Sequence, residues 1–248
     1  MKQLTINQLP QLPFDVAESV NQLRVNLGFC GREIKAIMIT SSTPDEGKSF
    51  VSVNLWQQMA HVGNRTLLID CDLRNSEMRT RYGIGGDDKV LGLVHYLAGQ
   101  VELDDIIYQT DVSGGFIIPV ATHIANPSLL LEGERFEKLM AYCRDYFDYV
   151  IVDTPPLMNV ADGLNIATHC DGTVLVVRSG VTSRRLVENS IQMLQKTSTP
   201  LLGTVLNRVN TNRKAYRYYY KRYYNSYGYY GGNLFFKKTV CDQCKQMW

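Results

Sequence analysis

Short apolar, β-branched runs alternate with longer helical patterns from Ile34 to Asn207, and this alternation restricts the possible folds more than any other feature of the chain. The runs with the length of strands are 35–41, 65–70, 115–120, 148–153, 172–177 and 201–207. Several are apolar throughout, which is typical of strands that helices cover on both faces. Helical patterns occupy 16–29, 48–61, 128–146 and 183–196. These patterns predict an α/β fold with a doubly wound, mainly parallel sheet.

The length and composition fit one globular domain followed by a different kind of segment. We expect the domain to span residues 1–210 of the 248 and a tyrosine-rich flexible tail to span 211–248. No apolar run approaches the roughly 18 residues that cross a bilayer, and the N-terminus lacks the apolar core of a secretion signal. The six cysteines show no framework spacing. A cytoplasmic protein is therefore expected.

The segment between the strand at 35–41 and the helix at 48–61 has the pattern of a phosphate-binding loop. It reads Ser42-x-x-x-x-Gly47-Lys48-Ser49, with serine in place of the usual first glycine. Gly47 allows the backbone to approach phosphates, Lys48 neutralises their charge, and Ser49 is suited to ligating Mg²⁺. Contacts with the nucleotide are expected from Ser42, Asp45, Glu46, Gly47, Lys48, Ser49 and Phe50. The placement after a strand and before a helix predicts an ATP site of P-loop NTPase type.

Aspartates end two further predicted strands. Asp70 ends the run at 65–70 and Asp72 follows it, and Asp153 ends the run at 148–153, directly before Thr154 and two prolines. The carboxyl ends of strands in an open α/β sheet are where ligands bind. Carboxylate oxygens suit Mg²⁺, and one of these groups can also take a proton. Together with the loop at 42–49, these motifs predict one nucleotide–Mg²⁺ site.

Tyrosine is concentrated near the C-terminus, where nine of the eighteen residues from Ala215 to Gly232 are tyrosine. They are Tyr216, Tyr218, Tyr219, Tyr220, Tyr223, Tyr224, Tyr227, Tyr229 and Tyr230. A packed helix is one alternative, which the interspersed asparagine and glycines oppose. Stacking on single-stranded nucleic acid is another, but the domain offers no basic face for it, so no nucleic-acid partner is expected.

The motifs around Lys48, Asp70-x-Asp72-x-Arg74 and Asp153-Thr154-Pro155-Pro156, followed by a tyrosine cluster, resemble the bacterial tyrosine kinases of capsule and exopolysaccharide synthesis (BY-kinases). The resemblance covers about residues 16–230 and includes the segments 126–140 and 160–182. It implies these roles: phosphate and Mg²⁺ binding by Lys48 and Ser49, assistance to the incoming hydroxyl by Asp70, organisation of the metal by Asp72 and Asp153, and adenine contact by Asn207.

The resemblance also implies an activity and partners. In that family ATP phosphorylates tyrosines of the C-terminal cluster on neighbouring subunits of a ring. A chain without its own membrane span resembles the split form of the family, in which a transmembrane activator of the polysaccharide chain-length family recruits the kinase to the inner face of the cell membrane. A cognate tyrosine phosphatase is a further expected partner. The tyrosines listed above would then be the phosphorylated residues.

Two positions depart from the family pattern. Asp45 replaces a glycine of the loop, and aspartate tolerates a positive φ better than most residues. The family's ring-assembly helix carries Glu-x-x-Arg-x-x-Arg, whereas this chain has Glu18-x-x-Asn21-x-x-Arg24. Glu18 and Arg24 are therefore the expected oligomer contacts, with the middle arginine missing.

A second class shares the expected fold and all three strand-end motifs. Partition and division-site ATPases use ATP only as a dimerisation switch and do not phosphorylate tyrosine. They carry a signature lysine four residues before the loop glycine, where this chain has Thr43. The tyrosine cluster has no role in that class. The kinase is the favoured reading, and the non-kinase switch ATPase is the alternative.

Overall fold

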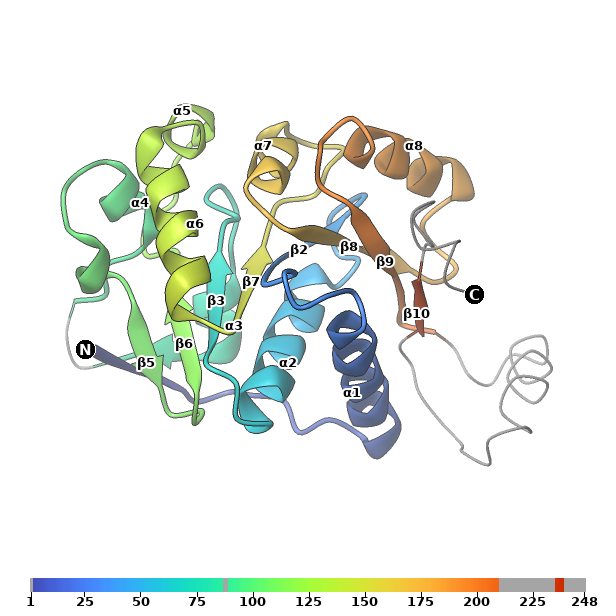
Figure 1. The fold of residues 1–248 in the computed structure, drawn as a ribbon, viewed down its shortest axis with the longest axis horizontal. Coiled ribbons are helices and arrows are strands. Elements are labelled where there is room, and N and C mark those ends of the chain that lie inside the picture. Colours follow the sequence, from blue (N-terminus) through green and yellow to red (C-terminus); the bar gives the residue numbers. More distant parts are fainter. Residues whose placement is uncertain (1, 87–88, 210–234, 239–248) are drawn as a thin grey trace.

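The computed structural model describes residues 2–86, 89–209 and the backbone of 235–238, and in it one mixed sheet runs through the whole molecule (Figure 1). Its strands are β1 (Lys2–Ile6), β2 (Ala36–Ser41), β3 (Thr66–Asp70), β4 (Ile84–Gly85), β5 (Tyr108–Thr110), β6 (Gly115–Ile118), β7 (Tyr149–Asp153), β8 (Gly172–Arg178), β9 (Leu201–Asn207) and β10 (Phe235–Lys238). Their order across the sheet is β10-β9-β8-β2-β7-β3-β6-β5-β1-β4.

Helices lie on both faces of this sheet. They are α1 (Phe14–Gly28), α2 (Lys48–His61), α3 (Met78–Tyr82), α4 (Leu93–Leu97), α5 (Ser128–Leu131), α6 (Glu134–Tyr146), α7 (Asp162–Thr168) and α8 (Arg184–Leu194). A short 3₁₀ helix spans Leu103–Asp105. None of the helices in the described residues is long and apolar enough to span a membrane.

The six central strands are parallel and are the six that the sequence predicts. From β9 to β6 each strand pairs in parallel with its neighbour. Alternate residues of β2 belong to different hydrophobic cores: Met38 packs into the core beneath α4 to α8, and Ile39 packs into the core beneath α1 to α3. A strand buried on both faces is apolar over most of its length, as β2 is from Ala36 to Ile39. The prediction of a doubly wound α/β fold is confirmed.

The structure differs from the expectation at the edge of the sheet beyond β6. There β5 pairs antiparallel with β6, β1 pairs parallel with β5, and β4 pairs antiparallel with β1. These strands are two to five residues long, and their polar residues on one side leave no continuous apolar run in the sequence. Short edge strands of this kind carry too little pattern to be found from sequence.

One predicted helix is in fact two. The segment 128–146 forms α5 and α6, which are separated at Gly133, where the backbone is extended with φ −79° and ψ 154°. Glycine is a poor helix former, and an extended residue there ends one helix and begins the next. The apolar spacing continues through the break because both helices pack into the same core, through Leu131 and Phe136.

Residues 235–238 fall within the predicted flexible tail, yet they form β10. This strand pairs antiparallel with β9, with Phe235 opposite Leu206 and Lys238 opposite Gly203. It also lies against α1 (Figure 1). The nine tyrosines of the cluster lie outside the described residues, so their role stays a prediction.

Candidate active site

The loop between β2 and α2 has the backbone of a phosphate-binding loop. Gly47 has φ 93°, and a Cβ at this position would lie 2.1 Å from the side-chain nitrogen of Asn207. Both facts require glycine here. Asp45, which stands where the family has a glycine, has a positive φ of 61°. Aspartate tolerates this conformation better than most residues, so the loop keeps its shape without that glycine.

Glu46 supports this loop from inside. Its carboxylate is buried and accepts hydrogen bonds from the Ser42 amide at 2.9 Å, from the Thr43 hydroxyl at 3.1 Å and from the Thr182 hydroxyl. The Ser42 hydroxyl in turn accepts a hydrogen bond from Ser190 at 2.9 Å. The side chains of Ser42 and Glu46 therefore face the protein interior, and any contact they make with a nucleotide comes from their backbone. The sequence gives no sign of Thr182 or Ser190, because they come from the segment around α8.

Lys48, at the start of α2, lies between two strand-end aspartates. Its Nζ is 3.0 Å from Asp72 Oδ2 and 4.0 Å from Asp153 Oδ2. Burial lowers the pKa of Lys48, but the charges of Asp153 and Asp72 outweigh burial, so its pKa lies above the usual value. Lys48 is therefore a cation held at the floor of the cleft, as a phosphate-binding lysine has to be.

Strand register brings the aspartates together. Asp70 and Asp153 are paired residues at the ends of neighbouring parallel strands, β3 and β7. Asp153 accepts hydrogen bonds from the hydroxyls of Ser49 at 2.7 Å and Ser52 at 2.8 Å. Burial raises the pKa of Asp153, while the charge of Lys48 acts in the opposite direction. The three motifs found in the sequence converge at one edge of the sheet.

Asp70 lies behind this surface. It is fully buried, and burial followed by the charge of Asp153 raises its pKa to about 7. The Ser76 hydroxyl donates a hydrogen bond to Asp70 Oδ2, and the Asp72 amide donates to Oδ1 at 3.2 Å. A carboxyl group with this pKa exchanges its proton near neutral pH, which is the property of a general base.

The oxygen atoms of the site fit Mg²⁺. Ser49, Asp72 and Asp153 present a hydroxyl and two carboxylates around Lys48. Among the described residues, no three His, Cys, Asp or Glu side chains lie close enough to hold a metal by themselves. That is expected of Mg²⁺, which usually takes one or two carboxylates and completes its shell with water and substrate phosphates. The donor set therefore fits a metal that enters with the nucleotide.

A second hollow lies beside the loop where adenine contact is predicted. It is lined by Val16, Phe50, Tyr82, Asn207 and Arg208, among others. The Asn207 side chain donates to the Glu46 carbonyl at 2.9 Å and accepts from the Arg208 amide at 2.8 Å. Asn207 thus joins the end of β9 to the loop, and contact with adenine stays a prediction. Arg208, with φ 54°, lines both this hollow and the Lys48 cleft, and the sequence analysis missed it.

Arg74 has a structural partner that the sequence analysis also missed. Its Nε lies 2.7 Å from Asp162 Oδ2, and its Nη1 donates to the Ala125 carbonyl. The Ser128 hydroxyl donates to the other oxygen of Asp162 at 2.7 Å. Hydrogen bonds to Asp162 raise the pKa of Arg74. This cluster ties the segment at 126–140 and the start of α7 to the wall of the cleft.

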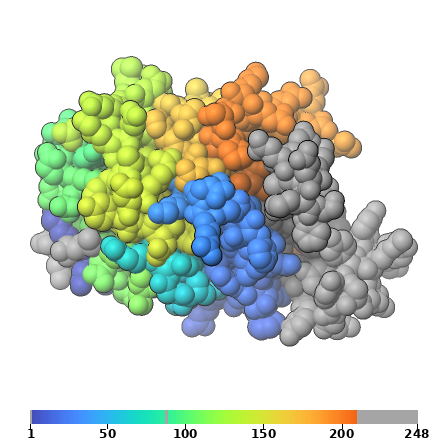
Figure 2. All heavy atoms as spheres, viewed as in Figure 1, coloured from blue at the N-terminus to red at the C-terminus, as the bar shows by residue number. Residues whose placement is uncertain are grey.

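The expected oligomer contacts lie on α1, away from these groups, and Figure 2 shows this helix, in blue, at the surface. Glu18 is exposed. The Arg24 guanidinium donates to the Asn21 side chain at 3.1 and 2.9 Å. Asparagine at this position therefore holds Arg24 along its own helix. The role of Glu18 and Arg24 in assembly stays a prediction.

Several known proteins are similar to this chain in sequence or in structure. A family model described as an AAA domain matches residues 34–203. The tyrosine-protein kinase CpsD of Streptococcus agalactiae is 38% identical over 214 residues, which cover 86% of this chain and 89% of that protein. The chain is also similar in structure to the kinase domain of Escherichia coli tyrosine kinase ETK, with a TM-score of 0.73 and 33% identity over 80% of this chain and 79% of that chain.

The alternative class has a structural neighbour as well. The septum site-determining protein MinD of Pyrococcus horikoshii, solved with Mg-ADP, gives a TM-score of 0.62 at 23% identity, covering 72% of each chain. At that identity the likeness concerns the fold alone. The kinase relatives are similar in sequence over most of the domain.

Proposed function

Since the chain belongs to the bacterial tyrosine kinase (BY-kinase) family, we propose that it uses ATP and Mg²⁺ to phosphorylate the tyrosines of its own C-terminal cluster. One observation carries this proposal: Lys48, Ser49, Asp72 and Asp153 meet at one cleft, with Asp70 directly behind it. A base near neutral pH beside these groups serves transfer to a hydroxyl. Switch ATPases share the same motifs, so the choice of tyrosine as the acceptor is supported by the kinase relatives and by the tyrosine cluster.

The groups divide the chemistry as follows. The amides of the loop and Lys48 hold the β- and γ-phosphates, and Mg²⁺ supplies further neutralisation of their charge. The tyrosine oxygen forms a bond to the γ-phosphorus while the bond from that phosphorus to the bridging oxygen of ADP breaks. The hydroxyl proton is taken up by Asp70, which is linked to the cleft through the hydroxyl of Ser76. Asn207 and Phe50 border the hollow proposed for adenine.

Transfer between subunits of a ring is the proposed arrangement, with Glu18 and Arg24 at the contacts. Each phosphate adds about −1.5 to −2 charges, so three would cancel the five basic residues at 213–222. Further phosphates would make the cluster acidic, and the carboxylates of the site would then repel it. Phosphorylation would in this way favour separation of the subunits.

The proposed setting follows the CpsD relatives and the family resemblance. The kinase acts in the cytoplasm, at the inner face of the membrane, where a transmembrane activator of the polysaccharide chain-length family recruits it. A cognate tyrosine phosphatase resets it. Cycling between the two states would regulate synthesis and export of capsular or exopolysaccharide.

Substitution of Lys48 tests the proposal. The purified protein with ATP and Mg²⁺ should become phosphorylated on tyrosine, and Lys48→Met should reduce this by about a hundredfold or more, because one charge-stabilising group is worth that much in a transition state. Phosphotyrosine immunoblotting and mass spectrometry measure the effect. Lys48→Arg, which keeps the positive charge between Asp72 and Asp153, is the matched control. Thermal melting of the three proteins shows whether each substitution preserves the fold.

The outcomes separate the two classes. A folded wild-type protein that hydrolyses ATP and dimerises with it, but forms no phosphotyrosine, would be a switch ATPase of the partition or division-site type. Substantial phosphotyrosine on a folded Lys48→Met protein would remove the catalytic assignment of the cleft.

A further inference from the structure

Ser76 separates the buried carboxyl group of Asp70 from the cleft. The Ser76 hydroxyl donates a hydrogen bond to Asp70 Oδ2 and accepts one from the Met78 amide at 3.1 Å. Asp70 is completely buried, whereas Ser76 is partly exposed and lines the cleft that also contains Lys48 and Asp72. A group that enters the cleft therefore meets Ser76 and not Asp70.

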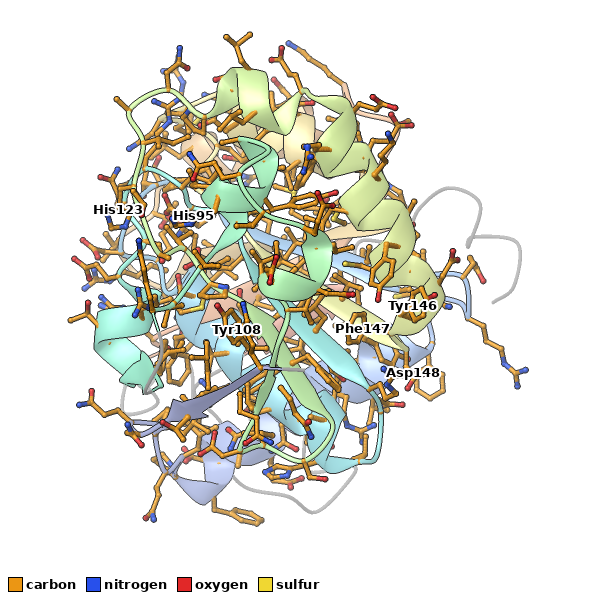
Figure 3. The ribbon with its side chains drawn as sticks, turned by 90° about the vertical axis from the view of Figure 1, so that its left-hand side faces the viewer. His95, Tyr108, His123, Tyr146, Phe147 and Asp148 are labelled. Atoms are coloured by element: carbon orange, nitrogen blue, oxygen red, sulfur yellow. The ribbon has the colours of Figure 1, made fainter. Side chains whose placement is uncertain are left out.

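The main-chain amide and carbonyl of Ser76 both have hydrogen-bond partners. Its amide donates to the Asp72 carbonyl at 3.0 Å, and its carbonyl oxygen lies 2.8 Å from His123 Nε2, on the segment before α5 (Figure 3). The orientation of the hydroxyl is fixed in addition by its bonds to Asp70 and Met78. A hydroxyl oxygen can accept two hydrogen bonds, and Met78 supplies one. Within residues 2–86 and 89–209, no second group donates to Ser76 Oγ, which leaves one acceptor position for a donor.

We propose that the hydroxyl of the acceptor tyrosine donates its hydrogen bond to Ser76 Oγ, so that Ser76 is the positioning residue for the phosphate acceptor. This rests on the proposed function, because it specifies how the substrate of that reaction is held. A tyrosine hydroxyl bound there lies in the same cleft as Lys48, which holds the phosphates.

The cleft that Ser76 lines also has walls that suit an aromatic ring. Pro155, Pro156 and Val160 line the same cleft. Tyrosine combines an apolar ring with a polar tip, and its buried hydroxyl usually has a hydrogen-bond partner. The ring thus packs on the proline side while the hydroxyl binds Ser76. Serine or threonine acceptors would be too short to use both parts.

A steady-state assay between two chains tests this directly. The enzyme carries phenylalanine at the nine cluster tyrosines, and the acceptor is the full-length Lys48→Met chain. Ser76→Ala in the enzyme should raise the KM for the acceptor chain about tenfold, which is the effect of one lost hydrogen bond, while the KM for ATP changes less than twofold. Ser76→Thr, which keeps the hydroxyl, should restore the KM for the acceptor.

A matched control removes a hydroxyl that serves only as a helix cap. Ser183 Oγ accepts from the Leu186 amide at 3.3 Å at the start of α8, as Ser76 does from Met78. Ser183→Ala should leave the KM for the acceptor unchanged. If Ser76→Ala does not melt like the wild type, Ser76→Cys, which keeps the volume but accepts hydrogen bonds poorly, takes its place.

Each outcome decides. An unchanged KM for the acceptor in Ser76→Ala overturns the inference, and a fall in kcat alone would mean that Ser76 only supports Asp70 and α3. A wild-type enzyme that phosphorylates no tyrosine at all defeats the proposed function instead, and the wild-type arm shows this without any Ser76 variant.

Discussion

At the scale of single residues, the site contains a carboxyl group, that of Asp70, whose ionisation is disfavoured in the folded protein. Asp70 is fully buried and its pKa is raised from 3.8 to about 7, mainly by burial. A carboxyl group with a raised pKa binds its proton more tightly in the folded protein than in the unfolded chain. The stability it contributes is therefore present at low pH and is lost as the pH rises from about 4 through about 7. Such a cost is typical of functional sites.

Asp70→Asn should therefore be more stable than the wild type at pH 8, by roughly 1 to 4 kcal/mol, because asparagine places no charge in the buried position. The difference should shrink as the pH is lowered from 8 to 5.5, since the wild-type carboxyl group becomes protonated. Urea unfolding of the nucleotide-free, metal-free proteins at several pH values measures this. A difference that does not depend on pH would contradict the raised pKa.

At the scale of elements, α1 presents the expected assembly face. Charge reversal at exposed Glu18, or at Arg24, should lower the oligomer mass of the unphosphorylated protein in light scattering, because an intersubunit ion pair becomes a repulsion. Asn21→Arg, which restores the family pattern, should have the opposite effect, since Arg24 loses its partner on the same helix. Unchanged masses for all three variants would place the oligomer interface elsewhere.

The sequence predicted elements where the physical signal is long and regular. The central strands are mostly buried and each contains a run of apolar residues, so all six were found, and α2 was found with its limits of 48–61. The loop motif and the strand-end aspartates were found because parallel strands place their ends together. The edge strands β1, β4, β5 and β10 were missed, because pairing with a neighbour, and not their own pattern, fixes them.

The missed residues of the site follow the same rule. Thr182 and Asp162 act through partners distant in sequence: Thr182 is 136 residues from Glu46, and Asp162 is 88 residues from Arg74. No local pattern marks such contacts. The positive φ of Asp45, in contrast, was open to prediction, since it concerns the intrinsic preference of one residue in a known loop.

At the scale of the whole molecule, the question is which subunit phosphorylates which. A chain with Lys48→Met and an intact cluster, mixed with an active chain whose nine cluster tyrosines are phenylalanine, should gain phosphate on the inactive chain, because transfer between subunits is proposed. Phenylalanine is preferred to truncation after Asn210, which would also remove β10 and uncover the edge of β9. Mass spectrometry of the inactive chain gives the result.

The opposite result is equally clear. If the inactive chain stays unmodified while the wild type labels itself at a rate independent of protein concentration, transfer takes place within one chain, and the proposed ring switch fails.

Because β10 pairs with β9, the tyrosine cluster is attached to the sheet at both of its ends and not at one end only. Residues 208–234 join the end of β9 to the start of β10, and Phe235 lies opposite Leu206. The proposed substrate segment is therefore the connection between two neighbouring strands of the enzyme's own sheet. Its midpoint can travel at most half its contour length, roughly 45 Å. A single proteolytic nick on either side of the cluster would release one end, and the tyrosines next to the cut would then reach farther than the closed loop allows, so limited proteolysis should alter which subunits can exchange phosphate.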